Sequence, residues 1–321
     1  MKRYSLGRSG IEVAPLALGG NVFGWTADET RSFEVLDAFI DAGFNLIDTA
    51  DMYSNWVDGH VGGESERMIG AWLRQSGRRK DVVIATKVGM EMAPDRKGLS
   101  RDYILEACDA SLERLGVDTI DLYQAHIDDG DTPLEETLGA FAELIESGKV
   151  RAIGASNYAA ERLAEALEVS AANSLPRFET MQPWYNLYER VGFEGPLEDV
   201  CKREGLGVIP YFGLASGFLT GKYRTEADFS KSPRGEGVKR MLDARGLKIL
   251  AALDDISAEY GATPAQVSLA WLRAHGAIPI ASATTTEQLL ELAGSAEIEL
   301  NNASVAKLDA ASVGGEPPPG W

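Results

Sequence analysis

Four side chains that can move protons stand at or just beyond the ends of three successive apolar runs: Asp48, Tyr53, Lys87 and His126. Each run has the length and composition of a buried strand. In a parallel α/β barrel the carboxyl ends of all strands face one pocket, so residues far apart in sequence meet there. We therefore expect these four side chains to form one reactive centre.

The pairing of a tyrosine with a lysine suggests a proton donor. A free phenol has a pKa of about 10. A lysine cation about 4 Å away stabilises the tyrosinate by roughly 4 kcal/mol at an effective dielectric of ~20, which is about three pKa units. This proximity predicts that Lys87 brings the pKa of Tyr53 close to neutrality. Asp48 would keep Lys87 charged and oriented, and a neutral His126 would hold a substrate carbonyl while hydride reaches its carbon.

The apolar runs belong to a pattern that extends along most of the chain. Each run is followed by a stretch with helical periodicity, and eight such units is the count of a (β/α)8 TIM barrel, an α/β fold. The helix starts Thr132-Pro133-Leu134-Glu135 and Thr263-Pro264-Ala265-Gln266 both predict a capped first turn. The runs cover residues 16–18, 44–47, 82–85, 120–123, 152–155, 178–181, 207–211 and 278–281.

Three segments depart from this even spacing. Residues 4–6 and 11–13 flank turn residues and predict an N-terminal β-hairpin that plugs the barrel floor. About 65 residues separate the seventh and eighth strands, and the glycine-rich, charged stretch 213–237 predicts a long functional loop. No linker divides the chain, so we predict one domain over residues 1–313 and an irregular, proline-rich tail over 314–321.

Composition limits the partners. The chain has 321 residues with 31 basic and 49 acidic side chains, a net charge of −18, which argues against nucleic acid and acidic membranes as partners. Cys108 and Cys201 lack C-x-x-C spacing, and His60 and His275 lack metal spacing and are expected at the surface. No run approaches the ~18 apolar residues of a membrane span. We expect a soluble, cytoplasmic protein, and the sequence does not indicate its oligomeric state.

Several long motifs follow one another in a set order. They are 44–53 (FNLIDTADMY), 63–66 (GESE), 84–87 (IATK), 121–126 (DLYQAH), 148–157 (GKVRAIGASN), 181–186 (MQPWYN) and 214–223 (LASGFLTGKY). With these motifs the chain resembles the aldo-keto reductases over nearly its whole length. The resemblance implies a (β/α)8 barrel that reduces the carbonyl of a small molecule with NADPH. It also implies that Asp48, Tyr53, Lys87 and His126 are the catalytic tetrad, with Tyr53 as the acid.

The resemblance extends to the nicotinamide end of the cofactor. Ser156 and Asn157 match the pair that hydrogen-bonds the carboxamide, Gln182 matches the amide partner beside it, and Tyr211 matches the aromatic that stacks on the ring. These residue types suit the ligand, because a flat uncharged ring needs a π face below it and amide-type partners at its edge.

The phosphates are expected at two further segments. Many family members carry a basic residue just after the eighth strand, but residues 281–288 contain none, and neutral donors attract a phosphate less strongly than cations do. NADPH is the expected cofactor, with NADH as the alternative. The residues implied are Leu214, Ser216, Gly217 and Lys222 for the pyrophosphate, and Ser282, Thr284 and Gln288 for the 2′-phosphate.

The substrate itself is not named by the sequence. The loop 54–62 is longer than the family's usual link, and Trp25, Trp56 and Trp184 are candidates for an apolar substrate pocket. The alternative is that these tryptophans cover hydrophobic patches.

Two other functions remain open. Potassium-channel β subunits resemble the same family and act mainly by binding a membrane partner. A Schiff-base lyase would use Lys87 as its nucleophile, although the nearby Asp48 favours a charged lysine.

Overall fold

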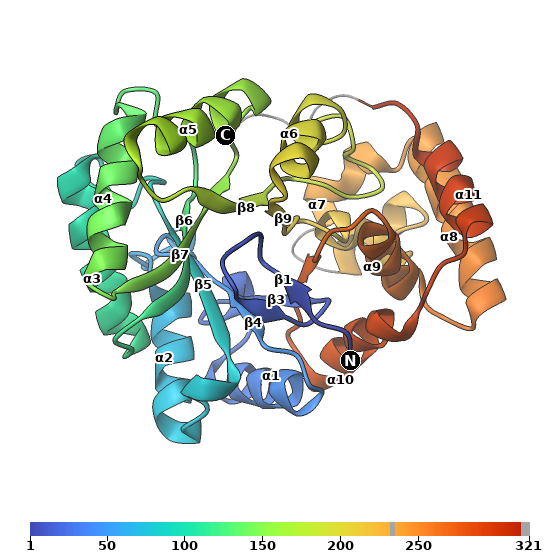
Figure 1. Ribbon diagram of the computed structural model, residues 1–321. Coiled ribbons are helices and arrows are strands. Elements are labelled where there is room, and N and C mark those ends of the chain that lie inside the picture. The colour runs from blue at the N-terminus through green and yellow to red at the C-terminus, as the bar shows by residue number, and fades with distance from the viewer. Residues whose placement is uncertain (232–234, 316–321) are drawn as a thin grey trace.

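The computed structural model describes residues 1–231 and 235–315 (Figure 1). The part of the predicted tail beyond residue 315 lies outside these residues. Within them, the chain forms eight parallel strands with helices between them, preceded by an antiparallel hairpin. The strands are β1 (Tyr4–Ser5), β2 (Glu12–Val13), β3 (Ala17–Gly19), β4 (Leu46–Asp48), β5 (Val83–Val88), β6 (Ile120–Ala125), β7 (Val150–Ser156), β8 (Phe178–Gln182), β9 (Gly207–Val208) and β10 (Ile280–Ala281).

The parallel strands curl into a barrel. Their hydrogen-bonded order is β10-β3-β4-β5-β6-β7-β8-β9. The ends of this sheet approach each other, since the Ile278 amide donates to the Val208 carbonyl at 2.8 Å and the Ile280 amide to the Pro210 carbonyl at 3.0 Å. The prediction of a (β/α)8 barrel is confirmed, and each predicted apolar run overlaps a strand.

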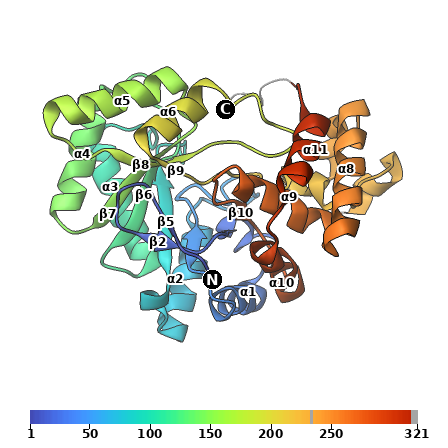
Figure 2. The ribbon, with the colours of Figure 1, turned by 45° about the vertical axis from the view of Figure 1, so that its right-hand side comes forward.

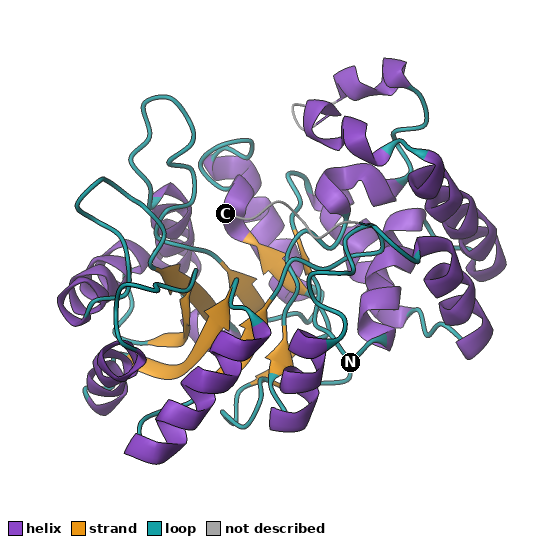
Figure 3. Cartoon of the chain, turned by 90° about the horizontal axis from the view of Figure 1, so that it is seen from above, coloured by secondary structure: helices purple, strands orange, loops and turns teal. Residues whose placement is uncertain are grey.

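The helices form an outer layer around the strands (Figure 3). Late in the chain, α8 and α11 lie side by side (Figures 1 and 2). The main helices are α1 (Glu29–Asp41), α2 (Glu64–Ser76), α3 (Arg101–Leu115), α4 (Leu134–Glu146), α5 (Ala160–Asn173), α6 (Pro196–Glu204), α8 (Ala244–Tyr260), α9 (Pro264–Ala274), α10 (Thr286–Ala293) and α11 (Asn302–Ser312).

The predicted helix starts have different outcomes. In α9 the Thr263 side chain accepts from the Gln266 amide, and the Gln266 side chain accepts from the Thr263 amide, which completes the predicted capping box. The capping prediction for α4 is wrong. That helix begins without a side-chain cap, because its N-cap position is Pro133, and the Thr132 hydroxyl donates to Asp129 Oδ2 at 2.7 Å.

The hairpin closes the barrel floor, as predicted. Leu6, Ile11 and Val13 are buried and pack in one apolar cluster with lumen-facing strand residues such as Leu46 and Leu122. Burial of these side chains fills the amino-terminal end of the lumen, so polar groups gather at the opposite end, where the strands finish.

The connection between β9 and β10 is more ordered than the predicted loop. Its short helical segments are Ala215–Thr220, Glu226–Lys231, α7 (Gly235–Val238) and Lys239–Met241, and α8 and α9 follow them. Phe218 and Leu219 in the first of these segments are buried in the main apolar cluster, and this segment contacts α7 and α9.

The described part of the chain contains no helix long and apolar enough to cross a membrane. Cys108 on α3 and Cys201 on α6 are buried thiols outside any disulfide. In the same residues, no group of three or more histidine, cysteine or acidic side chains is placed to hold a metal ion.

Candidate active site

Lys87 lies at the centre of the predicted tetrad. Its Nζ donates to Asp48 Oδ2 at 2.7 Å, to the Thr49 carbonyl at 2.8 Å and to the Tyr53 hydroxyl at 2.9 Å. The lysine side chain is fully buried. The structure therefore brings Asp48, Tyr53 and Lys87 into direct contact.

The backbone after β4 explains this meeting. The Thr49 amide donates to the Ala85 carbonyl at 2.8 Å and the Asp51 amide to the Lys87 carbonyl at 3.3 Å, so the chain continues alongside β5 beyond the end of β4. A turn closed by the Tyr53 amide and the Ala50 carbonyl then folds back. This turn directs Tyr53 over the lysine that lies near the end of the neighbouring strand.

His126 completes the set from the end of β6. Its ring centroid lies 6.0 Å from that of Tyr53, with the rings inclined by 70°. Burial, and then the charge of Lys87, hold the pKa of His126 well below its usual range. Nδ1 is buried without a hydrogen-bond partner among the described residues, which places the proton of the neutral ring on Nε2. A neutral His126, as expected from the sequence, can donate from Nε2.

The predicted direction of the pKa shift of Tyr53 is wrong. Lys87 is as close as the predicted effect requires, but burial and the negative charge of Asp48 raise the pKa of Tyr53 well above its usual value. Burial also lowers the pKa of Lys87, against the attraction of Asp48. The lysine charge is shared with a carboxylate 2.7 Å away, so its attraction for a tyrosinate offsets only part of the effect of burial and of Asp48.

Buried amides complete the surroundings of Asp48. Gln182 Nε2 donates to Asp48 Oδ1 at 2.8 Å, and Gln124 Nε2 approaches the same oxygen at 3.4 Å. Gln124 was not predicted from the sequence. Because side chains alternate along a strand, Gln124 shares the lumen face of β6 with Leu122 and His126, and this period-two pattern would have found it.

The residues expected at the nicotinamide join one polar chain. Ser156 Oγ donates to the Gln182 carbonyl at 2.9 Å, Asn157 Nδ2 donates to the His126 carbonyl at 2.9 Å, and the Tyr211 hydroxyl donates to Asn157 Oδ1 at 2.7 Å. Asn157 holds a left-handed backbone with φ 57°. This donor and acceptor set beside the Tyr211 ring fits an aromatic ring with a carboxamide substituent.

The expected pyrophosphate segment has an unusual backbone. Ala215, Ser216 and Gly217 are successive left-handed residues with φ of 48°, 55° and 92°. Before them, Leu214 has φ −104° and ψ 14°, and such a change from negative to positive φ turns neighbouring amides toward one side and creates an anion-binding concavity. The Gly217 amide itself donates to the Leu214 carbonyl at 2.9 Å, and the exposed Lys222 places Nζ beside Gly217. A phosphate fits this combination.

The expected 2′-phosphate residues contact one another and the loop after β3. Ser282 Oγ donates to Asn21 Oδ1 at 2.6 Å, and both the amide and the hydroxyl of Thr284 donate to Gln288 Oε1. Asn21, which follows β3, was not predicted from the sequence. The segment offers hydroxyls and an amide NH2, and no cation of its own.

The tryptophans expected in the substrate pocket occupy different places. Trp25 and Trp56 meet edge to face at 5.6 Å, and Trp56 lies 6.1 Å from the Tyr53 ring. Trp184 packs against Tyr211 at 5.9 Å and is closest to the expected nicotinamide position. Trp56 is 45% exposed, as a side chain at the rim of a pocket would be.

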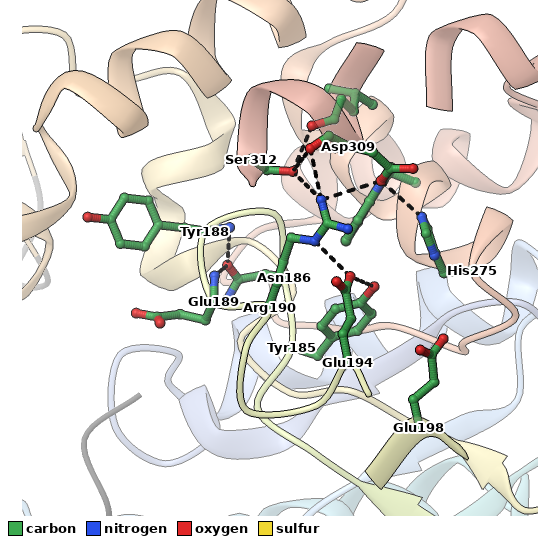
Figure 4. A network of polar contacts seen from close by, with 12 residues as sticks. Tyr185, Asn186, Tyr188, Glu189, Arg190, Glu194, Glu198, His275, Asp309 and Ser312 are labelled. Carbon is green, nitrogen blue, oxygen red and sulfur yellow. Dashed lines mark hydrogen bonds and ion pairs between the residues drawn. The ribbon is translucent and has the colours of Figure 1, made fainter. Parts of the chain in front are cut away.

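A polar network supports the segment after β8, which carries Trp184 (Figure 4). Arg190 Nη1 donates to the Asp309 carbonyl at 3.0 Å and to Ser312 Oγ at 2.7 Å, both on α11. His275 was expected at the surface, but it is half-buried, packs at a tilt against Trp271 with ring centroids 4.5 Å apart, and lies 3.2 Å from Asp309 Oδ1. That prediction is wrong, because the C-terminal helix covers the ring.

Known proteins resemble this chain over nearly its full length. A model of the aldo/keto reductase family matches residues 15–313. The aldo-keto reductase yakc [NADP(+)] of Schizosaccharomyces pombe is 33% identical, over 93% of this chain and 88% of that protein. The uncharacterized oxidoreductase YrpG of Bacillus subtilis is 35% identical, over 94% and 93%. A probable voltage-gated potassium channel subunit beta of rice, Oryza sativa subsp. japonica, is 34% identical, over 91% and 90%.

Proposed function

Because the chain belongs to the aldo/keto reductase family of carbonyl-reducing enzymes, we propose that it reduces an aldehyde or ketone to the alcohol with NADPH. Tyr53 donates the proton in this proposal. The observation that carries it is the contact of Lys87 Nζ with both Asp48 and Tyr53, at the end of the barrel where the strands finish.

The raised pKa of Tyr53 suits a donor that keeps its proton until it is needed. Hydride addition to a carbonyl makes an alkoxide about as basic as hydroxide, which is far more basic than a tyrosinate. Such an alkoxide takes a proton even from a phenol whose pKa is raised. Lys87, 2.9 Å from the hydroxyl, then stabilises the tyrosinate that remains.

His126 orients the carbonyl in this scheme. Its neutral ring donates from Nε2 to the substrate oxygen without competing as an acid. The edge of Trp56 beside Tyr53 and the ring of Trp25 provide apolar contacts for the substrate, which favours aldehydes and ketones with a hydrophobic or aromatic group.

The bound cofactor supplies the hydride from the nicotinamide C4. In this proposal Ser156, Asn157 and Gln182 hold the carboxamide and Tyr211 lies against the ring. The choice of NADPH is supported by the NADP(+) in the name of the Schizosaccharomyces pombe relative. The phosphates would contact Leu214, Ser216, Gly217 and Lys222 on one side and Ser282, Thr284 and Gln288 on the other.

The test follows NADPH absorbance with a panel of aldehydes, ketones and sugars. We expect oxidation of NADPH with at least one carbonyl class, and loss of turnover by about 1,000-fold in Tyr53→Phe with cofactor binding retained. Full residual activity in Tyr53→Phe would remove the assigned acid. A tenfold or greater preference for NADH would overturn the choice of cofactor.

A regulatory role is the second candidate, and the similarity to the rice channel subunit favours it. Tight cofactor retention without turnover of any carbonyl would select that role. A Schiff-base lyase has less support. Burial lowers the pKa of Lys87, as such chemistry needs, but its contacts with Asp48, Thr49 and Tyr53 engage the three N–H groups of a charged ammonium. Borohydride trapping of a covalent adduct would favour the lyase instead.

A further inference from the structure

Gln124 and Gln182 lie in the barrel lumen next to Asp48, and both are buried, at 0% and 1% exposure. Gln182 Nε2 donates to Asp48 Oδ1 at 2.8 Å and to Gln124 Oε1 at 3.3 Å. Gln124 Nε2 lies 3.4 Å from the same Asp48 oxygen. The three side chains therefore form a closed triangle of hydrogen bonds.

The chemistry of a carboxylate fixes the direction of this triangle. Asp48 Oδ1 can only accept, so the Gln182 group that faces it must be the NH2. The second N–H of that NH2 goes to Gln124 Oε1, which leaves the Gln124 NH2 to face Asp48. Both N–H groups of Gln182 are thus engaged, and its Oε1 accepts no hydrogen bond from the described residues.

We propose that Gln124 is a positioning residue: it holds the Gln182 amide so that Oε1 accepts from the NH2 of the nicotinamide carboxamide. This inference rests on the proposed function, because it assumes a nicotinamide cofactor beside Gln182. Without Gln124, the Gln182 amide loses the acceptor for its second N–H and can rotate. The amides also occupy Asp48 Oδ1, which leaves Oδ2 for Lys87 and Tyr53.

The local packing leaves room for Gln124. A β-carbon on Gly154 of β7 would lie 3.2 Å from Gln124 Cγ and 2.1 Å from Thr180 Oγ1. The absence of a side chain at this glycine therefore leaves space for the side chain of Gln124. Thr180 is buried, and its hydroxyl has no hydrogen-bond partner in the part of the chain that the structure describes. Thr180→Val is therefore a matched control, because it changes a side chain near Gln124 and removes no hydrogen bond to Asp48.

The test compares the affinity of NADP+ with that of its 3-acetylpyridine analogue, in which a methyl ketone replaces the carboxamide and removes the NH2 donor. Dissociation constants come from quenching of tryptophan fluorescence. In the wild type we expect NADP+ to bind about tenfold more tightly than the analogue, which is the effect of one well-placed hydrogen bond. Gln124→Leu should reduce this preference to about threefold or less by weakening only NADP+. Thr180→Val should preserve it.

Gln124→Met, which keeps the length of the side chain, serves if the leucine variant does not fold. A full tenfold preference in a folded Gln124 variant would overturn the positioning role. So would equal weakening of both ligands, or a wild type that does not distinguish them. Wild-type protein that binds neither ligand and turns over no carbonyl would instead refute the proposed function.

Discussion

Tyr53 sits where burial and charge oppose its ionisation, with Lys87 as the stabilising cation. The phenol contacts that ammonium at 2.9 Å, but Asp48 shares the same cation and lies 3.4 Å from the phenol oxygen. Removing Lys87 would therefore affect Tyr53 and Asp48 together. It would leave Asp48 with the lumen amides but without its ion-pair partner.

We expect Lys87→Met to lower kcat by about 1,000-fold and to destabilise the fold by about 3–5 kcal/mol, the usual cost of leaving a buried charge unpaired. Adding Asp48→Asn should recover most of the stability and none of the activity. Urea unfolding and steady-state kinetics of the single and double variants would check this. A double variant no more stable than Lys87→Met would show that the ion pair is not the source of the loss.

Asp51 is a second buried carboxyl near the tetrad. Both of its side-chain oxygens lack a hydrogen-bond partner within the described residues. Burial, and then the negative charge of Glu66, raise the pKa of Asp51 from 3.8 to about 8. Between pH 3.8 and about pH 8, Asp51 is therefore protonated in the folded protein and ionised in the unfolded chain. Asp51 therefore contributes stability that is full below pH 3.8 and is lost as the pH rises to about 8.

Asp51→Asn should remove this dependence, because the amide keeps the shape without a titratable proton. From pH 5 to pH 8 the stability of the wild type should fall relative to that of the variant by about 1.4 kcal/mol per pH unit. The difference should level off above the folded-state pKa. Urea unfolding of both proteins across this range measures it, and parallel curves would show that Asp51 does not titrate there.

At the scale of the elements, the segment between β8 and α6 depends on the C-terminal helix. Arg190 on this segment has a side chain only 13% exposed, and it binds Glu194 at 2.7 Å as well as the end of α11. Its guanidinium also lies over the Trp271 ring at 5.4 Å. The same segment carries Trp184, so this network indirectly supports the expected nicotinamide site.

Arg190→Met should destabilise the fold by about 2–3 kcal/mol, because it leaves partly buried acceptors unpaired. Arg203→Met is the control. Arg203 pairs with its neighbour Glu204 on α6, its side chain is 60% exposed, and exposed pairs contribute about 0–1 kcal/mol. Chemical denaturation would measure both. Equal losses in the two variants would contradict the supporting role of Arg190.

The predictability of these elements from sequence varied with the range of the forces involved. The strands were predictable because a buried parallel strand needs a short apolar run. The Thr132 cap was not, because the helix begins only after Pro133 and the Thr132 hydroxyl donates to Asp129, three residues earlier, in a local turn. The helical segment at Ala215–Thr220 depends on burial of Phe218, whose ring contacts Tyr188 far away in the sequence, which a local pattern cannot show.

The site shows the same division. Position near a strand end was enough to predict that Asp48, Lys87 and His126 lie at one end of the barrel. The electrostatics were not predictable from a single lysine–tyrosine distance, because burial and Asp48 together reverse the direction of the pKa shift. The lumen position of Gln124 could be predicted from the alternation along β6, but its hydrogen bonds to Asp48 and Gln182 could not, because those side chains come from two other strands, β4 and β8.

At the scale of the whole molecule, the charge of −18 opposes an anionic cofactor. The local attraction of Lys222 acts over a short range, whereas the summed repulsion extends as far as screening allows. The Debye length falls from about 30 Å at 0.01 M salt to about 8 Å at 0.15 M. A higher salt concentration should therefore weaken the repulsion between the acidic surface and the cofactor more than it weakens the attraction of Lys222.

We expect the association rate of NADPH to rise several-fold between these salt concentrations, and that of NADH to rise less, because NADH lacks the 2′-phosphate charge. Stopped-flow quenching of tryptophan fluorescence measures both rates on the same protein. Lys222→Gln should lower the rate for each cofactor and steepen the rise with salt, since it removes the opposing attraction. A rate that falls with salt would mean that cations near the phosphates outweigh the field of the whole surface.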